Sequence, residues 1–247
     1  MPGPNPREMM LLETRRLSKS FGSLKAADAI DVTVAAGEAV GIIGPNGAGK
    51  STLFNLIAGN IAADAGQVLL ERNDITRLKA HQRCAAGIGR SYQIPLPFEH
   101  LTVFENLLVA AVHGRGMSVR AATDFCADIL DRTGLLRRAN AAAGSLTLLE
   151  RKRLEMARAL ATAPKLLLLD EIAGGLTESE CAALVATIGG IRAGGITIVW
   201  IEHIVHALVA VVDRLIVLNF GRKIAEGQPQ TVMNSAEVRE IYLGLAA

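Results

Sequence analysis

Gly44-Pro45-Asn46-Gly47-Ala48-Gly49-Lys50-Ser51-Thr52 is the stretch of this sequence that decides its fold. It fits the pattern G-x-x-x-x-G-K-[ST] of phosphate-binding loops. The apolar run at 39–43 predicts a buried strand before it, and residues 53–58 predict a helix after it. Glycines let the backbone curl around an anion, with N–H groups pointing inward at a helix N-terminus. The stretch therefore predicts a nucleoside triphosphate site, in which Lys50 reaches the β- and γ-phosphates and Ser51 binds Mg²⁺.

Composition limits the classes of protein that this chain could be. Its 247 residues suffice for one large domain or two small ones, and 50% of them are hydrophobic. Lys and Arg number 26 against 24 Asp and Glu, so the net charge of +2 gives no support for binding nucleic acid. No run of about 18 apolar residues is present, so no membrane span is predicted. Residues 1–10 contain three prolines and no apolar run, which predicts a short flexible leader rather than a signal peptide.

The three cysteines, Cys84, Cys126 and Cys181, are far apart and form no CxxC pair. They have no metal-binding spacing with the five histidines. The sequence therefore predicts free or buried thiols of a reducing cytosol.

Strand and helix patterns alternate along the chain, which predicts a parallel α/β core. Short β runs at 11–34 predict a small β layer ahead of the phosphate loop. Residues 95–150 read as a helical insert, whose first helix opens with a Thr102–Glu105 capping box, and further helices are expected at 121–132 and 150–162. Apolar strands are expected at 165–170, 197–202 and 214–219.

The second half of the phosphate site follows the strand at 165–170. In a phosphate-loop protein, Asp170 at its end would hold Mg²⁺, and Glu171 would orient or deprotonate the attacking water. A pair of solvated acids is the alternative, which the upstream loop disfavours. His203 follows the next strand and is expected to point into the ligand crevice, and Gln93 could contact Mg²⁺ or the water.

The order of these motifs resembles that of the nucleotide-binding subunit of ATP-binding-cassette (ABC) transporters, from about residue 11 to the end. The resemblance implies a P-loop NTPase core with a parallel sheet, an N-terminal antiparallel β layer and a helical subdomain insert. The implied domain spans 8–247, with a RecA-like core at about 8–93 and 154–247 and a helical subdomain at about 94–153. It also implies hydrolysis of ATP, with Phe21 stacking on adenine, Gln93 in the glutamine loop, and His203 as the switch histidine. Mg²⁺ would be held by Ser51, Gln93 and Asp170.

Finer features are similar to the ATPases of branched-chain amino-acid importers. They are Arg90-Ser91-Tyr92-Gln93, Leu101-Thr102-Val103-Phe104-Glu105-Asn106, Ile201-Glu202-His203 and the tail at 238–244. This resemblance implies uptake of branched-chain amino acids or a related small polar solute such as urea or an amide. The implied partners are a second ATPase subunit, identical or different, two membrane permeases, and indirectly a periplasmic or surface binding protein. The chain would be cytoplasmic and peripheral on the inner face of the cell membrane. The permeases would dock on the segment 93–105, through Ile94, Leu96, Pro97, Phe98 and Leu101; ordinary packing of these residues in the helical insert is the alternative.

The sequence departs from this family at the signature motif, usually Leu-Ser-Gly-Gly-Gln, where it has Leu146-Thr147-Leu148-Leu149-Glu150. In the family, this motif faces the ATP bound by the partner subunit. Thr147 keeps the hydroxyl. Leu149 replaces a glycine and is expected to crowd the phosphate. Glu150 adds a negative charge, which Arg151 or Arg153 would have to offset.

A second departure follows Glu171, where the family has a proline and then an acid or amide that bridges the subunits. Here Thr177 would have to serve in its place. Lineage variation with function intact is one interpretation of these departures. The other is that, in a heterodimer, one composite ATP site is fully active and the other slow.

Two other classes stay open. One is the ATPase of a lipid or lipopolysaccharide exporter, which shares much of the core. The other is a soluble, non-transport ABC ATPase working on DNA or ribosomes. Long coiled coils, zinc motifs or a second cassette, typical of that class, are not found in this sequence.

Overall fold

The computed structural model describes residues 10–243, with side chains to residue 240. Its larger sheet has the strand order β10-β9-β3-β8-β7-β6. All neighbouring strands in it are parallel except β9 and β10. The strands are β3 (Ala39–Ile43), β6 (Ile88–Arg90), β7 (Leu166–Asp170), β8 (Thr197–Ile201), β9 (Arg214–Asn219) and β10 (Arg222–Gly227). The predicted parallel core is therefore confirmed.

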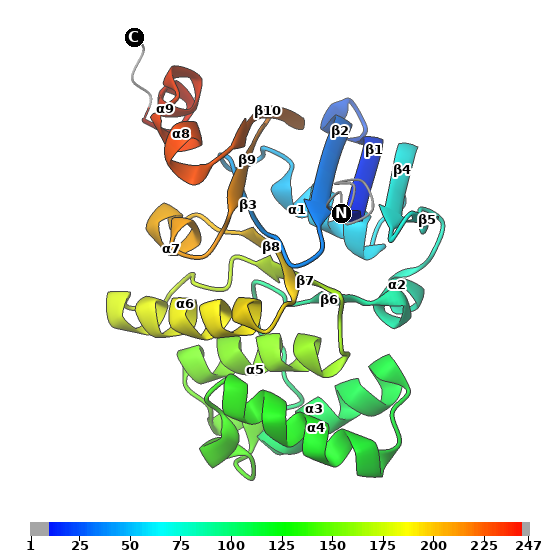
Figure 1. Cartoon of the computed structure of the whole chain (residues 1–247), viewed down its shortest axis with the longest axis vertical. Coiled ribbons are helices and arrows are strands. Elements are labelled where there is room, and N and C mark those ends of the chain that lie inside the picture. The colour runs from blue at the N-terminus through cyan, green and yellow to red at the C-terminus, as the bar shows by residue number, and fades with distance from the viewer. Residues whose placement is uncertain (1–9, 244–247) are drawn as a thin grey trace, which may run out of the picture.

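The smaller sheet is antiparallel, with the order β2-β1-β4-β5. Its strands are β1 (Met10–Phe21), β2 (Leu24–Ala35), β4 (Ala65–Leu70) and β5 (Asn73–Asp74). Strands β1 and β2 confirm the β layer predicted at 11–34, and β4 and β5, which follow the phosphate loop in the chain, complete this sheet. It lies beside the larger sheet in Figure 1.

The helices pack on both faces of the larger sheet, and those between residues 103 and 161 gather at the lower end of the molecule in Figure 1. In chain order, the helices are α1 (Lys50–Ala58), α2 (Ala80–Ala86), α3 (Val103–Val109), α4 (Val119–Arg132), α5 (Leu148–Ala161), α6 (Glu178–Ala193), α7 (Val205–Val209), α8 (Pro229–Asn234) and α9 (Ala236–Leu243). A π-helical turn, Ala110–Gly114, follows α3.

Side-chain caps decide where several of these helices begin. The predicted Thr102–Glu105 capping box is present at α3. The sequence placed the start of α5 at residue 150, but a second capping box, Thr147–Glu150, starts this helix at Leu148. Likewise α4 begins at Val119 rather than at residue 121, because Ser118 caps it.

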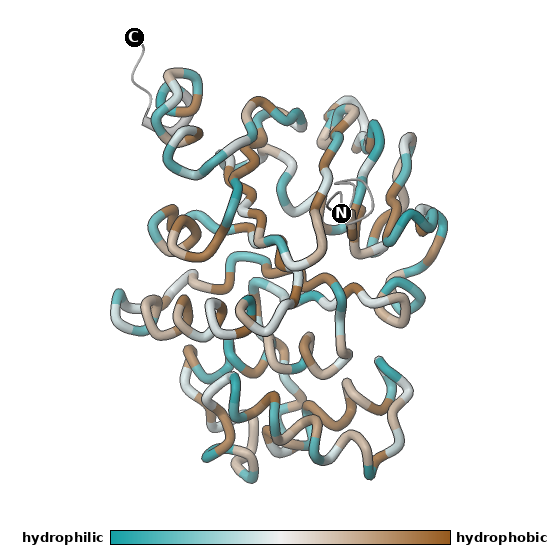
Figure 2. Tube along the Cα trace, in the orientation of Figure 1, coloured by the Kyte–Doolittle hydropathy of each residue, from teal (hydrophilic) through white to brown (hydrophobic). Residues whose placement is uncertain are grey.

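Each central strand of the larger sheet is buried on both faces. Leu166 and Leu168 of β7 join the hydrophobic cluster that contains α1 and the smaller sheet, whereas Leu167 and Leu169 join the cluster that contains α5 and α6. Double burial explains why this strand is an unbroken apolar run. Along the helices at the lower end of the molecule, hydrophobic and hydrophilic residues alternate, as expected for helices with one buried face (Figure 2).

Two further sequence predictions concern the N-terminal leader and the absence of a membrane span. The leader predicted at 1–10 lies, except for Met10, outside the described residues. Within residues 10–243, no helix combines the length and hydrophobicity needed to cross a bilayer.

Burial predicts how the three cysteines react in the native protein. All three are free, with Cys126 and Cys181 buried and Cys84 half-buried. Burial raises the pKa of the Cys126 thiol to about 11 and also raises the pKa of Cys181. Since the thiolate is the reactive form, we expect a maleimide at pH 7.5 to modify Cys84 alone, with all three labelled in urea. Peptide mapping by mass spectrometry checks this, and rapid native labelling of Cys126 would contradict the described core.

Candidate functional site

The functional side chains gather where the parallel strands end. The strands β3, β8, β7 and β6 are consecutive neighbours, so their carboxyl ends lie along one edge of the sheet. The phosphate loop follows β3, His203 follows β8, Glu171 follows β7, and Gln93 lies just beyond β6. In open α/β sheets, ligands bind in the crevice outside these strand ends. The sequence-predicted residues therefore come together from four separate segments.

The phosphate loop joins β3 to α1 in a conformation that needs glycine. Gly49 has a φ of 97°, and a Cβ there would lie 2.2 Å from the carbonyl oxygen of Ala26. At Gly44 a Cβ would lie 2.3 Å from the carbonyl oxygen of Leu218. No L side chain fits such contacts without movement of the backbone. The loop is therefore packed closely against the backbone of one strand from each sheet, β2 and β9.

Lys50 lies inside the curve of this loop. Its buried ammonium donates to the carbonyl oxygens of Gly44 at 2.7 Å and Pro45 at 3.1 Å. Burial lowers the pKa of Lys50, while Glu171 and Asp170 act in the opposite direction. The ammonium is therefore held at the centre of the loop, where an incoming phosphate would replace carbonyl oxygens as its partner.

Glu171 contacts two other residues that the sequence predicts for the site, Gln93 and His203. The Gln93 amide donates to Glu171 Oε2 at 2.6 Å, and His203 Nε2 lies 2.7 Å from Glu171 Oε1. Glu171 has a φ of 46°, a left-handed conformation that is uncommon for a residue with a side chain. Such strain is typical of functional positions. The arrangement places an amide and an imidazole on the carboxylate expected to activate water.

Asp170, one residue earlier, is buried and faces a different partner. Arg90 donates to its Oδ2 at 2.8 Å. Burial raises the pKa of the Asp170 carboxyl, and the hydrogen bond from Arg90 opposes this rise. Its Oδ1 accepts no hydrogen bond from the described residues. This free carboxylate oxygen and the exposed Ser51 hydroxyl are the oxygen donors that Mg²⁺ prefers.

Two buried charges next to this site were not assigned a role from the sequence. Glu202 accepts hydrogen bonds from the backbone N–H groups of Ala173 at 3.0 Å, His203 at 2.9 Å and Ile204 at 3.4 Å. It therefore fastens the loop after Glu171 to the turn that carries His203. The signal in the sequence was a carboxylate directly after an apolar strand, where a buried charge needs partners.

Lys152 of α5 is the second such charge. Its ammonium donates to the carbonyl oxygen of Gln93 at 2.7 Å, although the side chain is buried. Burial lowers the pKa of Lys152, while Glu202 and Glu171 favour its charged form. The sequence showed Lys152 only as part of a basic run, which gave no indication that it is buried.

The structure bears on two expectations about the signature segment. Leu149 is partly buried and packs against the hydrophobic core, whereas Leu148 is 42% exposed, so Leu148 is the more accessible of the two leucines. Glu150 pairs with Arg138 at 3.2 Å, and neither Arg151 nor Arg153 is its described partner. Glu150 also accepts the Thr147 N–H, because the two residues form the capping box of α5. The Thr147 hydroxyl oxygen accepts the Glu150 N–H, and its proton has no acceptor among the described residues.

Phe21 and Thr177 were predicted to contact adenine and the partner subunit, and the structure shows their contacts within this chain. Phe21 ends β1 at the hairpin to β2 and is 50% exposed, with the Lys19 ammonium 5.7 Å from its ring centroid. Thr177 caps α6 in a third capping box. An adenine contact for Phe21 and a bridging role for Thr177 both stay predictions.

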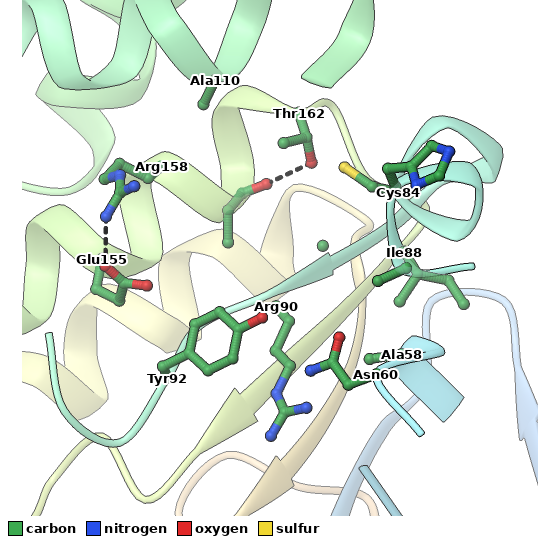
Figure 3. Close-up of a pocket in the computed structure, with 14 residues that line it drawn as sticks. Ala58, Asn60, Cys84, Ile88, Arg90, Tyr92, Ala110, Glu155, Arg158 and Thr162 are labelled. Atoms are coloured by element: carbon green, nitrogen blue, oxygen red, sulfur yellow. Dashed lines mark hydrogen bonds and ion pairs between the residues drawn. The ribbon is translucent and has the colours of Figure 1, made fainter. Parts of the chain in front are cut away.

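A cleft of about 300 Å³ lies beside the nucleotide site, between α2, β6 and α5. Arg90, Tyr92, Cys84 and Glu155 are among the residues that line it (Figure 3). Burial raises the pKa of Glu155, and Arg158, 2.9 Å away, opposes this rise.

Comparison with known proteins gives matches along nearly the whole chain. The family described as "ABC transporter" matches residues 27–174, and a C-terminal family described as "Branched-chain amino acid ATP-binding cassette transporter" matches residues 222–247. A crystal structure of a nucleotide-free ATP-binding cassette from an ABC transporter has a TM-score of 0.87 and 33% identity, covering 96% of this chain and 100% of that one.

Three curated relatives each cover 96% of this chain and 98% of their own length. The high-affinity branched-chain amino acid transport ATP-binding proteins LivG of Escherichia coli and BraF of Pseudomonas aeruginosa are 36% and 33% identical to it. The lipopolysaccharide export system ATP-binding protein LptB of Haemophilus influenzae is 32% identical.

The backbone bonds of Glu202 predict the effect of removing its charge. Glu202→Gln keeps the shape but turns one carboxylate oxygen into an N–H donor that faces a backbone N–H. We expect a loss of about 1–3 kcal/mol in the free energy of unfolding, measured by urea denaturation. Glu178→Gln, on the exposed start of α6, is the matched control and should change stability by less than about 0.5 kcal/mol. Equal stability of the two variants would exclude the fastening role of Glu202.

Proposed function

Because this chain belongs to the ABC transporter family of ATPases, we propose that it is the ATP-hydrolysing subunit of an importer of branched-chain amino acids or a related small polar solute such as urea or an amide. The observation that favours this substrate class is the match of residues 222–247 to the branched-chain amino acid cassette family. The similarity to LivG and BraF supports it as well.

The proposed reaction uses the residues at the edge of the larger sheet. The loop at 44–49 and Lys50 bind the β- and γ-phosphates through inward N–H groups and an ammonium. Glu171 orients the attacking water and accepts its proton, and Gln93 and His203 hold the carboxylate in place. His203 also donates to the γ-phosphate when Glu171 turns toward the water. Such catalysis consists mainly of positioning and charge stabilisation.

Asp170 and Ser51 are the residues proposed to hold Mg²⁺, since both present oxygen donors beside the loop. When bound, the ion neutralises charge on the phosphates. Gln93, also predicted as a ligand, donates its amide to Glu171 here. Its carbonyl oxygen is the atom that would turn toward Mg²⁺.

The proposed partners are inferred from two features, the signature segment at the start of α5 and the exposed apolar side chains of the segment 93–105. We propose that a second ATPase subunit, identical or different, places its ATP against Thr147 and the N-terminus of α5. Two permeases would dock on the segment 93–105, where Ile94 is 69% and Leu96 76% exposed. Arg158 supports this segment by donating to the carbonyl oxygen of Leu96 at 3.0 Å. The chain would then lie on the cytoplasmic face of the cell membrane, with a solute-binding protein on the other side.

Export of lipopolysaccharide or another lipid is the second candidate function. The observation that favours it is the similarity to LptB, at 32% identity over 236 residues. The site described above would serve an exporter equally well, because both kinds of transporter use ATP hydrolysis. The two candidate functions are therefore distinguished by identifying the transported substrate.

The proposed import function predicts that Glu171 is essential for uptake. In cells that lack this chain, wild type should restore uptake of labelled leucine and Glu171→Gln should not. In purified protein, Glu171→Gln should lower ATP hydrolysis by about 100-fold or more while ATP still raises the melting temperature. Glu178→Gln is the matched control with full activity. Normal leucine, urea and amide uptake without the chain, together with loss of surface lipopolysaccharide, would favour the exporter instead.

The exposed Leu148 predicts a gain of function. Leu148→Gly removes the side chain that faces a docked phosphate and should raise ATP turnover of the assembled transporter several-fold. Leu149→Gly is the contrasting variant, because it removes packing from the core and should cost about 2–5 kcal/mol of stability. Turnover assays and thermal unfolding distinguish the two. If Leu148→Gly leaves turnover unchanged, the leucine does not limit the site formed by α5.

A further inference from the structure

Arg90 lies at the junction of three parts of the molecule. It ends β6, and its side chain is 8% exposed. One guanidinium nitrogen, Nη2, donates to Asp170 Oδ2 at 2.8 Å, and the other, Nη1, donates to Asn55 Oδ1 of α1 at 2.7 Å. The fork of the guanidinium therefore ties the helix that follows the phosphate loop to the strand that carries Asp170.

Aromatic rings hold this guanidinium in place. Its central carbon lies 4.9 Å from the ring centroid of Tyr92 and 5.8 Å from that of Phe54, distances at which a cation is attracted to a ring face. Phe54 is fully buried, whereas Tyr92 is 46% exposed and lines the cleft. Figure 3 shows Arg90 and Tyr92 side by side along this cleft. Arg90 thus contacts the buried core on one side and an exposed ring on the other.

We propose that Arg90 is a positioning residue that sets the orientation of the Asp170 carboxylate and links it to the cleft beside α2. The inference rests on the proposed role of Asp170 in holding Mg²⁺. By binding Oδ2, Arg90 fixes the carboxylate rotamer and leaves Oδ1 directed away from the pair. Partners that orient a metal ligand in this way typically change metal affinity by about 10- to 100-fold when removed.

Through the same contacts, a group bound in the cleft can affect the proposed nucleotide site. A group that fills the cleft touches Tyr92 and Arg90 directly, and any shift of the guanidinium changes its bond to Asp170. Arg158 also lines the cleft, but its described partners are Glu155, the carbonyl oxygen of Leu96 and the ring of Phe98. Arg158 is therefore a cation of the same cleft with a different set of contacts, and it serves as the matched control.

The first test measures binding of a non-hydrolysable ATP analogue to the full chain, with Mg²⁺ and with EDTA. We expect Arg90→Met to weaken binding of the Mg²⁺ complex by about tenfold and to leave the affinity in EDTA unchanged. Arg158→Met should match wild type in both. Arg90→Lys keeps the charge but cannot bridge Asn55 and Asp170, so its binding should resemble that of Arg90→Met. It provides a second variant for the same test if Arg90→Met does not fold.

Asp170→Asn separates failure of the premise from failure of the inference. If this variant keeps the full Mg²⁺ effect, the proposed role of Asp170 is wrong. If Asp170→Asn loses the effect while both Arg90 variants behave like Arg158→Met, the positioning role of Arg90 is overturned.

The second test fills the cleft through Cys84, which lines it. Alkylation of wild type with a bulky maleimide should weaken binding of the Mg²⁺ complex at least threefold, and the label should have no further effect on Arg90→Met. A Cys84→Ser protein treated in the same way controls for other sites. A label that acts equally on wild type and Arg90→Met, or has no effect on wild type, would show that the cleft does not act through Arg90.

Discussion

Burial of both faces of the parallel sheet is the constraint on which the rest of this structure depends. Strands such as β7 leave no room for polar side chains within the core, so polar residues can follow only where the strands end. Because neighbouring strands run in the same direction, these ends meet at one edge. Asp170, Glu171, His203 and Gln93 become neighbours for this reason, although they are far apart in the chain.

The site is held together by buried charged side chains, each of which makes at least one hydrogen bond to a described residue. Glu202 binds three backbone N–H groups, Lys152 binds the Gln93 carbonyl, and Arg90 binds Asp170. A buried charge without partners would cost several kcal/mol. These contacts therefore fix the loops that carry the proposed catalytic groups, which is the preorganisation that phosphoryl transfer requires.

The similarity to both importer and exporter ATPases has a physical explanation. ATP chemistry is confined to the edge of the larger sheet, whose contacts are set by the fold. In the proposed transporter, recognition of a permease would depend instead on exposed side chains such as Ile94 and Leu96, which the core does not constrain. This division explains why one kind of cassette is similar to ATPases of both an importer and an exporter.

The sequence by itself determined the fold class, the phosphate loop and the helix cap at Thr102, because glycine spacing, apolar periodicity and capping pairs are local properties. Only the tertiary structure decided that Leu148 rather than Leu149 is exposed, that Arg138 pairs with Glu150, and that Arg90 and Glu202 hold the site. These contacts join segments distant in the chain, or depend on which face of a helix meets the core. A pairing between distant segments leaves no local pattern in the sequence, and two adjacent leucines at the start of a helix do not show which of them the core will cover.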